Sequence, residues 1–223
     1  MSLSRYSFAH AISGFFEFPT ENARALVPRP LEPVELHHGT SVLSMTVFDF
    51  TSSVVGAYRE LVFSVAVMPL VKPGERLPKS ALFPYLVATT TAASREHAIS
   101  TWHLPHWMED VDIDLVSAQG RMEARIRAGG TPVADLCVGE HSWEPVRQLY
   151  QSFMRGSDEV YVADILMEGR QSEHEDESGR LRLHDHAFHG TLALPEVSDI
   201  PFREVWMRDG VQTFESLVSL PAS

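Results

Sequence analysis

The stretch Val111–Val138, which reads VDIDLVSAQGRMEARIRAGGTPVADLCV, decides the expected fold class. Three β-prone runs in it are separated by the dipeptides Gln119-Gly120 and Gly129-Gly130. Glycine adopts positive φ at no steric cost, so these dipeptides are typical of two-residue hairpin turns. The stretch therefore predicts an antiparallel meander with strands at Val111–Ser117, Arg121–Arg127 and Thr131–Val138.

The segments before the meander continue the β pattern. Ser41–Phe50 carries apolar residues on both faces, which is typical of a buried strand. Ala57–Leu70 and Ala81–Thr91 are two further expected strands, and the first of them contains Glu60 among apolar neighbours. A carboxylate in such a place must be hydrogen-bonded, paired or protonated. Glu60 is therefore either the partner of an arginine in a structural ion pair or a carboxylate in a pocket.

One main helix is expected after the meander. Apolar residues from Val146 to Phe153 repeat at i, i+3, i+4 and i+7, with Ser142 as the N-cap and Gly156 as the stop. A shorter helix is expected over Thr20–Ala25.

Two hairpins complete the expected elements. The first joins Glu159–Glu168 to Arg180–Phe188 around an acidic loop, and the second turns at Asp209-Gly210. Such a chain is mainly β with minor α, and its strands must close into a complete or partial antiparallel barrel or a sandwich to hide their edges. No repeat or low-complexity linker divides the sequence, so residues 1–223 are expected to form a single domain.

Composition narrows the class of partner. The net charge of −12 argues against nucleic acid and anionic membrane surfaces, because both select clustered cations. No apolar run approaches the length of a membrane span. Cys137 is the only cysteine, so an intrachain disulfide is excluded and a reducing compartment is favoured. We expect a cytoplasmic protein with no nucleic-acid or membrane partner.

Three motifs resemble the acetoacetate decarboxylase superfamily over residues 20–140. The first is Ser53–Glu60, with the pattern Ser-x-Val-Gly-x-Tyr-x-Glu; the second is Phe83-Pro84-Tyr85; the third is Arg95-Glu96 followed by a Trp-x-x-Pro ending at Pro105. The resemblance implies a barrel of that family's type with a ligand pocket in its interior. It also favours the pocket as the place of Glu60.

The chain lacks the best-known chemical group of that family. In that family the Trp-Gly-x-Pro segment is followed by two lysines, the first of which forms an imine with a β-keto acid. The corresponding positions here are His106 and Trp107, and neither imidazole nor indole can replace a primary amine in that reaction. The two lysines of the chain, Lys72 and Lys79, lie in a turn-like segment instead. We therefore expect no Schiff base.

Two classes of function remain open. The first is an enzyme that acts on an oxo-acid or polyketide-like carbonyl compound by acid–base chemistry, through dehydration, cyclisation, retro-aldol cleavage or decarboxylation. Imidazole exchanges protons near pH 7, and burial raises the pKa of a carboxyl group. The expected catalytic residues are Glu60, His103 and His106, and the expected substrate-binding residues are Tyr58, Arg95, Trp102 and Trp107.

The second class is a non-catalytic protein that keeps the cavity for an apolar or carboxylic ligand. In both classes the partner is a small carbonyl or carboxylate molecule, and no cofactor is expected. A homo-oligomer is expected from the resemblance and from hairpin edges that need covering.

The histidines near the C-terminus carry a separate hypothesis. His184 and His186 would point to the same face of a strand, about 7 Å apart, and His189 or His174 could add a third metal ligand. No carboxylate at a recognised spacing completes the set. Solvated histidines on a strand are the better interpretation, and no metal site is expected.

Overall fold

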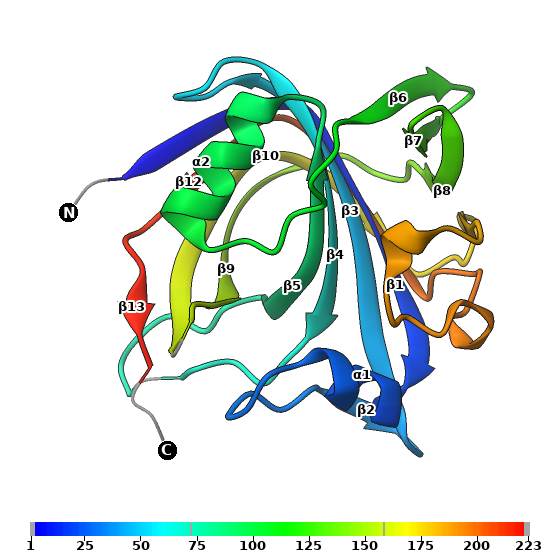
Figure 1. Ribbon diagram of the computed structural model, residues 1–223. Coiled ribbons are helices and arrows are strands. Elements are labelled where there is room, and N and C mark those ends of the chain that lie inside the picture. The colour runs from blue at the N-terminus through cyan, green and yellow to red at the C-terminus, as the bar shows by residue number, and fades with distance from the viewer. Residues whose placement is uncertain (1–2, 72, 158, 221–223) are drawn as a thin grey trace.

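Seven long strands close on themselves to form a barrel (Figure 1). The computed structural model describes residues 3–71, 73–157 and 159–220. Around the barrel the order is β1-β12-β10-β9-β5-β4-β3, and β3 pairs with β1 to complete the circle. The bounds are β1 (Ser4–Pro19), β3 (Thr40–Ser52), β4 (Tyr58–Ala66), β5 (Ser80–Thr89), β9 (Glu144–Arg155), β10 (Val160–His174) and β12 (Arg203–Phe214). The predicted mainly-β closed barrel is confirmed.

All neighbouring barrel strands are antiparallel except β5 and β9, which pair in parallel over three residues. Two short strands extend the wall: β2 (Glu35–His37) beside β3, and β13 (Val218–Ser219) beside β10. The ring leaves none of its described strands at a free sheet edge, but the β5–β9 seam pairs over three residues of each strand and is open along the rest.

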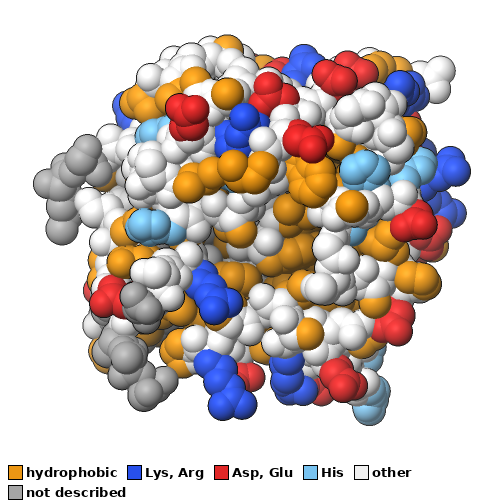
Figure 2. Space-filling model, viewed as in Figure 1, with side chains coloured by type: hydrophobic (Ala, Val, Ile, Leu, Met, Phe, Trp, Pro, Cys, Tyr) orange, Lys and Arg blue, Asp and Glu red, His pale blue; other side chains and the backbone are white. Residues whose placement is uncertain are grey.

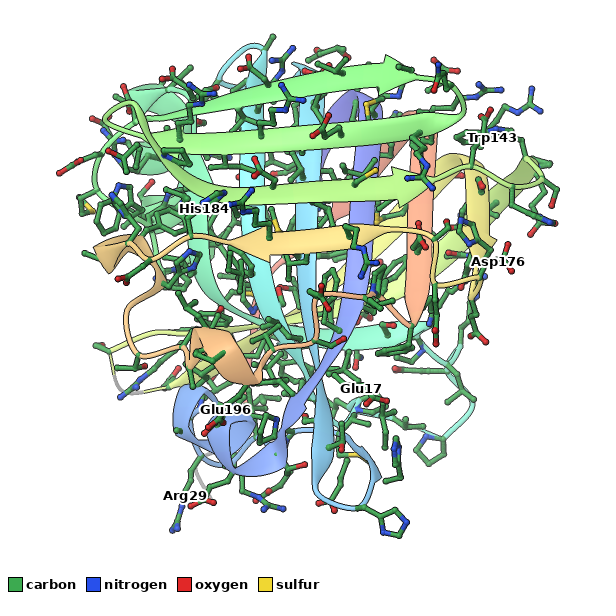
Figure 3. All side chains as sticks on the ribbon, turned by 90° about the vertical axis from the view of Figure 1, so that its right-hand side faces the viewer. Glu17, Arg29, Trp143, Asp176, His184 and Glu196 are labelled. Carbon is green, nitrogen blue, oxygen red and sulfur yellow. The ribbon has the colours of Figure 1, made fainter. Side chains whose placement is uncertain are left out.

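A second, four-stranded sheet covers one outer side of the barrel (Figure 3). Its order is β11-β8-β7-β6, with bounds β6 (Val111–Ala118), β7 (Arg121–Ala128), β8 (Thr131–Gly139) and β11 (Arg180–Leu183). The predicted meander is confirmed, and both turn dipeptides have positive φ at each residue. One core cluster joins this sheet to the outward-facing side chains of the barrel, such as Ile12, Leu61 and Phe63. The opposite faces of the same strands form a second cluster inside the barrel.

Two helices accompany the sheets. The short helix α1 (Thr20–Leu26) matches the predicted one. Helix α2 (Ala92–Trp102) was not predicted; the side chain of Thr91 caps it by accepting a hydrogen bond from the Ser94 amide, 3.2 Å away. It lies against one end of the barrel, where Trp102 packs into the interior cluster. Two 3-10 turns, η1 (Ala187–His189) and η2 (Leu194–Glu196), follow β11.

Three predicted elements are wrong. The hairpin expected between Glu159–Glu168 and Arg180–Phe188 does not form, because β10 pairs with β9 and β12 in the barrel whereas β11 pairs with β8 in the second sheet. Strand β11 also ends at Leu183, so His184 and His186 do not share a strand.

The segment expected as the main helix is strand β9, which is held by β10 on one side and β5 on the other, so tertiary pairing overrides the helical spacing. The hairpin expected at Asp209-Gly210 is absent, because β12 runs through this dipeptide without a turn. Asp209 has φ of 50° and lies at a bulge between β10 and β12.

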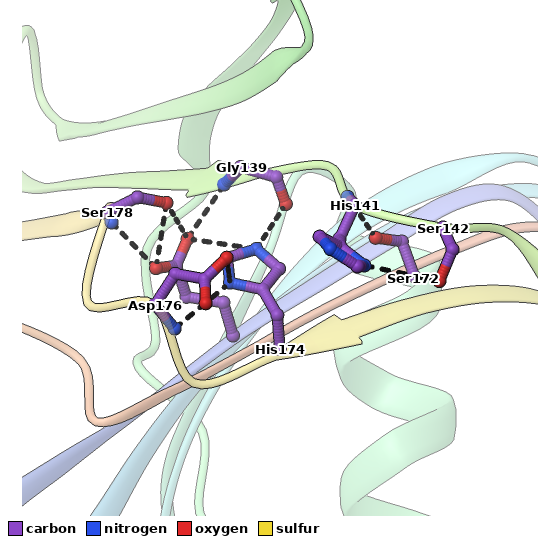
Figure 4. A network of polar contacts seen from close by, with 9 residues as sticks. Gly139, His141, Ser142, Ser172, His174, Asp176 and Ser178 are labelled. Atoms are coloured by element: carbon purple, nitrogen blue, oxygen red, sulfur yellow. Dashed lines mark hydrogen bonds and ion pairs between the residues drawn. The ribbon is translucent and has the colours of Figure 1, made fainter.

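A buried carboxylate joins β12 to the second sheet (Figure 4). Glu204 is fully buried, and it accepts hydrogen bonds from the amides of Gly139 and Gly179, each at 2.7 Å. The Ser178 hydroxyl donates to the same carboxylate, and the ring of His174 lies 3.8 Å from it. The backbone of the β8 and β11 ends is therefore tied to the barrel wall through one side chain.

None of the helices in the described part of the chain is long and apolar enough to cross a membrane.

Candidate functional site

The barrel encloses a cavity of about 110 Å³. Side chains from all seven barrel strands line it, together with Leu104 from the segment after α2. Most of the walls are apolar, for example Phe15, Phe48 and Phe214. Hydrophobic side chains also gather in the middle of the face that Figure 2 shows. Such a cavity is the usual form of a small-molecule site.

Glu60 is the acidic side chain among the described residues that line the cavity. Alternation along β4 places it on the inner face, between Phe48 of β3 and Thr89 of β5. It is 8% exposed, and it forms no hydrogen bond or ion pair with another described residue. Burial in this apolar environment raises its pKa to about 8. The alternative of an ion pair with an arginine is not what the structure has, because the adjacent Arg59 pairs with Asp49, at 3.0 Å.

Two tyrosines lie within electrostatic reach of Glu60. Burial, then the nearby Glu60, raises the pKa of Tyr58, whose hydroxyl finds no hydrogen-bond partner among the described residues. Burial also raises the pKa of Tyr6, and Glu60 adds to the effect. Both phenols are therefore protonated at neutral pH. Tyr58 lies two residues before Glu60 on β4 and packs in the interior cluster, but it is not among the residues that line the cavity.

Tyr6 belongs to a hydrogen-bond chain that leads from the interior to the surface. The indole Nε1 of Trp102 donates to the Tyr6 hydroxyl over 2.8 Å, and the same hydroxyl forms a hydrogen bond with Nε2 of His97, 2.7 Å away. The other ring nitrogen of His97 faces the hydroxyl of Thr101 at 3.2 Å. Burial lowers the pKa of His97. Sequence reasoning did not include Tyr6 among the site residues, because 91 positions separate it from His97.

His103 and His106 do not line the cavity. His103 ends α2 in the left-handed conformation, with φ of 53°, and its exposed ring stacks on Tyr161 with 5.0 Å between ring centroids. His106 pairs with Val87 in an isolated parallel bridge beside the cavity wall. Both of its ring nitrogens are buried and without a hydrogen-bond partner in the described part of the chain. Burial, and then the charge of Arg95, lower its pKa to about 4, so the ring is neutral at pH 7.

The other expected ligand contacts are divided between the cavity end and the outside. Trp102 is buried at the end of the interior cluster, with its ring 4.6 Å from that of Phe214. Trp107 packs on the outer side of the barrel against Phe188, at 5.4 Å. Arg95 pairs with Asp110 at 2.6 Å and does not line the cavity.

No lysine is among the described residues that line the cavity. Lys79 forms an ion pair with Glu173 at the barrel end away from α2. Lys72 lies outside the described residues.

The C-terminal histidines are engaged separately. His184 contacts Asp135 at 2.9 Å, His186 accepts a hydrogen bond from the Phe188 amide, and Nε2 of His189 lies 3.0 Å from the Val133 carbonyl (Figure 3 shows His184). Within the described ranges, no group of three or more potential ligands is placed to hold a metal ion.

Comparison with known proteins identifies the fold. The sequence matches no protein-family model and no curated protein. Among solved structures, an acetoacetate decarboxylase superposes with a TM-score of 0.65 at 14% identity, over 99% of this chain and 90% of that chain. The enduracididine biosynthesis enzyme MppR, with HEPES buffer bound, gives a TM-score of 0.65 at 13% identity, over 98% and 88%. An acetoacetate decarboxylase-like enzyme from Sphingomonas wittichii gives 0.61 at 12%, over 100% and 94%. The chain therefore has the acetoacetate decarboxylase fold.

Proposed function

We propose that this protein is a small-molecule enzyme of the acetoacetate decarboxylase-like superfamily in which Glu60 transfers protons to and from a carbonyl ligand. One observation carries the proposal: Glu60 is a buried carboxyl group without a partner among the described residues, and it faces an apolar cavity. Its pKa of about 8 lies near neutral pH, where both protonation states are populated and proton transfer is efficient. A buried carboxyl group without a partner lowers the stability of the fold, and such groups are typical of acid–base catalysts.

The position of Glu60 fits proton transfer next to a carbonyl. The ionised form of Glu60 removes a proton from the carbon beside the carbonyl, and negative charge develops on the oxygen. The protonated Glu60 then returns the proton to carbon or gives it to a leaving hydroxyl. Dehydration, retro-aldol cleavage, cyclisation and decarboxylation of an activated acid all pass through such an enol or enolate.

The proposal excludes a Schiff base and gives no proton-transfer step to the two histidines. Lys79 is held by Glu173, and the motif position that carries the family's lysine is His106. His103 and His106 lie outside the cavity lining, and His106 is neutral at pH 7.

Exchange of hydrogen for deuterium tests the proposal directly. The protons beside the carbonyl of hexan-2-one are followed by NMR in D₂O, with and without the protein. We expect exchange above the buffer rate, and we expect Glu60→Gln to abolish it. Glu168→Gln is the matched control, since Glu168 is an exposed carboxylate that pairs with Arg147.

A non-catalytic binding protein is the alternative, and the largely apolar lining favours it. In that case hexan-2-one binds, as calorimetry would show, but its protons exchange no faster than in buffer. That result would reject the catalytic role of Glu60.

A further inference from the structure

A charged cluster occupies the barrel end opposite Glu60. It consists of Lys79, Glu173 and Arg203, and we call it the cationic cluster. Nη2 of Arg203 lies 2.6 Å from Oε1 of Glu173, while Lys79 and Gln171 contact Oε2 of the same carboxylate. The three charged side chains are between 20% and 25% exposed. Two cations share one carboxylate, so the cluster carries one uncompensated positive charge.

The cationic cluster lies next to residues that line the cavity, although its own members are not among the lining residues. Arg203 is the cross-strand partner of Phe15, and Glu173 is the cross-strand partner of Val205. Phe15 and Val205 both line the cavity, and directly paired residues share one face of a sheet. The guanidinium carbon of Arg203 lies 5.0 Å from the centroid of the Phe15 ring. The charges therefore stand at the end of the apolar space and not on the outer wall.

Two polar atoms in and beside the cationic cluster have no hydrogen-bond partner among the described residues. Nε of Arg203 and Oε1 of Gln171 are buried and find no hydrogen-bond partner among the described residues. A buried donor without an acceptor lowers stability, and an oxygen atom from a ligand would satisfy it. Guanidinium groups bind carboxylates with favourable geometry, since their N–H groups form a planar fork.

The distance to Glu60 defines what kind of ligand fits. Phe15 pairs with Ser44, and Ser44 pairs with Ser64, so Arg203 lies near the level of Ser64 on the barrel wall. Ser64 is four residues beyond Glu60 on β4, which corresponds to about 13 Å at about 3.3 Å per residue. Apolar side chains fill most of the walls between these two levels.

We propose that the cationic cluster binds the carboxylate of an amphipathic ligand whose apolar chain fills the cavity and whose far end reaches Glu60. An apolar cavity of about 150 Å³ accepts benzene, so one of about 110 Å³ accepts a chain of at most about six carbons. The substrate class is then an oxo acid whose carbonyl lies far from its carboxylate, in contrast to a β-keto acid. The reaction at the far end rests on the proposed function, whereas the binding of the carboxylate does not.

Calorimetry with two probes of equal length tests this inference. Hexanoate carries the carboxylate, and hexanamide replaces it with a neutral group. We expect hexanoate to bind at least tenfold more tightly than hexanamide at low salt. Arg203→Gln should reduce the affinity for hexanoate at least tenfold and leave that for hexanamide unchanged. The matched control is Arg147→Gln, which removes an exposed guanidinium paired with Glu168.

The direction in which a second variant changes the affinity for hexanoate separates a binding site from a structural ion-pair network. Glu173→Gln removes the internal carboxylate that competes for both cations, so it should tighten hexanoate binding. Equal affinity of the wild type for the two probes, or unchanged or weaker hexanoate binding in Glu173→Gln, would overturn the inference. This variant decides the matter if Arg203→Gln does not fold. If the wild type shows no proton exchange above the buffer rate but keeps its preference for hexanoate, the proposed chemistry at Glu60 fails and the carboxylate site stands.

Discussion

Replacing Glu60 with glutamine should change how the stability of the protein depends on pH. Glutamine has nearly the shape of a protonated glutamic acid, but it does not ionise. The pKa of Glu60 is about 8 in the folded protein, raised by burial from 4.5. Between these two values the folded state binds more protons than the unfolded state, so stability falls as the pH rises. The penalty is absent below about pH 4.5 and complete above about pH 8.

The size of the effect follows from the two pKa values. Each pKa unit corresponds to about 1.4 kcal/mol, so the difference between 4.5 and about 8 corresponds to a penalty on the order of 5 kcal/mol above pH 8. At pH 7 the penalty is about 3 kcal/mol, since ionisation of Glu60 is still incomplete there. This is a large part of the total stability of a typical domain.

Urea denaturation of wild type and Glu60→Gln between pH 5 and pH 9 measures this effect. Other titrating groups are common to both proteins, so their contribution cancels in the difference between the two free energies of unfolding. We expect the two proteins to be nearly equal at pH 5 and the variant to be increasingly more stable up to about pH 8. Glu168→Gln, which alters an exposed side chain, should stay within about 0.5 kcal/mol of wild type throughout.

Two results would refute the reasoning. A difference that does not change with pH means that Glu60 titrates normally and does not face an apolar cavity. A wild type that gains on the variant as the pH rises means that an ion pair lowers the pKa of Glu60.

Four other outcomes are expected. Borohydride treatment in the presence of 3-oxobutanoate should leave the intact mass unchanged, because Lys79 is held by Glu173; an adduct mapped to a lysine would restore the Schiff-base route. Glu204→Ala should lower the free energy of unfolding, measured by urea denaturation, by about 2–6 kcal/mol, because it leaves two buried amides without an acceptor. A decrease below about 1 kcal/mol would contradict the role of this carboxylate. Tyr6→Phe should lower the free energy of unfolding by about 1–3 kcal/mol, because it removes the hydrogen-bond acceptor of the Trp102 indole. It should also shift the NMR resonance of that indole N–H, and an unchanged resonance would argue against the hydrogen-bond chain. Light scattering at micromolar concentration should show a homo-oligomer, since β6 leaves one edge of the smaller sheet unpaired within the described chain; a monomer would contradict this expectation.

Local signals in the sequence predicted the meander and failed for β9, for a physical reason. The glycine turns act through the conformation of two residues, so no distant contact is needed to recognise them. Strand β9 contributes to both apolar layers: Phe153 packs into the outer core cluster and Met154 into the inner one. Its apolar residues therefore do not alternate, and their spacing coincides with that of a helix. The pairing with β10 and β5 that decides the matter is not visible in the segment itself.

The same distinction applies to the site. Glu60 was predicted because an acidic residue in an apolar strand is conspicuous along the sequence, and the resemblance favoured a pocket. His103 and His106 were expected in the cavity from their place in a motif, but the end of α2 turns His103 outward. Tyr6 and Arg203 reach the barrel interior from opposite ends of the chain. Only closure of the barrel brings them near the cavity, so no local pattern indicated them.

The two buried carboxylates of this barrel show how the surroundings of a residue separate structure from chemistry. Glu204 is fully buried, and backbone amides and a hydroxyl occupy its oxygens (Figure 4). The fold itself supplies hydrogen-bond donors to both of its oxygens, so neither oxygen is left for a ligand. Glu60 is almost as deeply buried, but no described residue donates to it. Burial then favours its neutral form, and the proton it holds is available to whatever fills the cavity. If Glu60 served the fold, a partner would compensate its burial as it does for Glu204, so the absence of a described partner is the reason to assign Glu60 to a ligand.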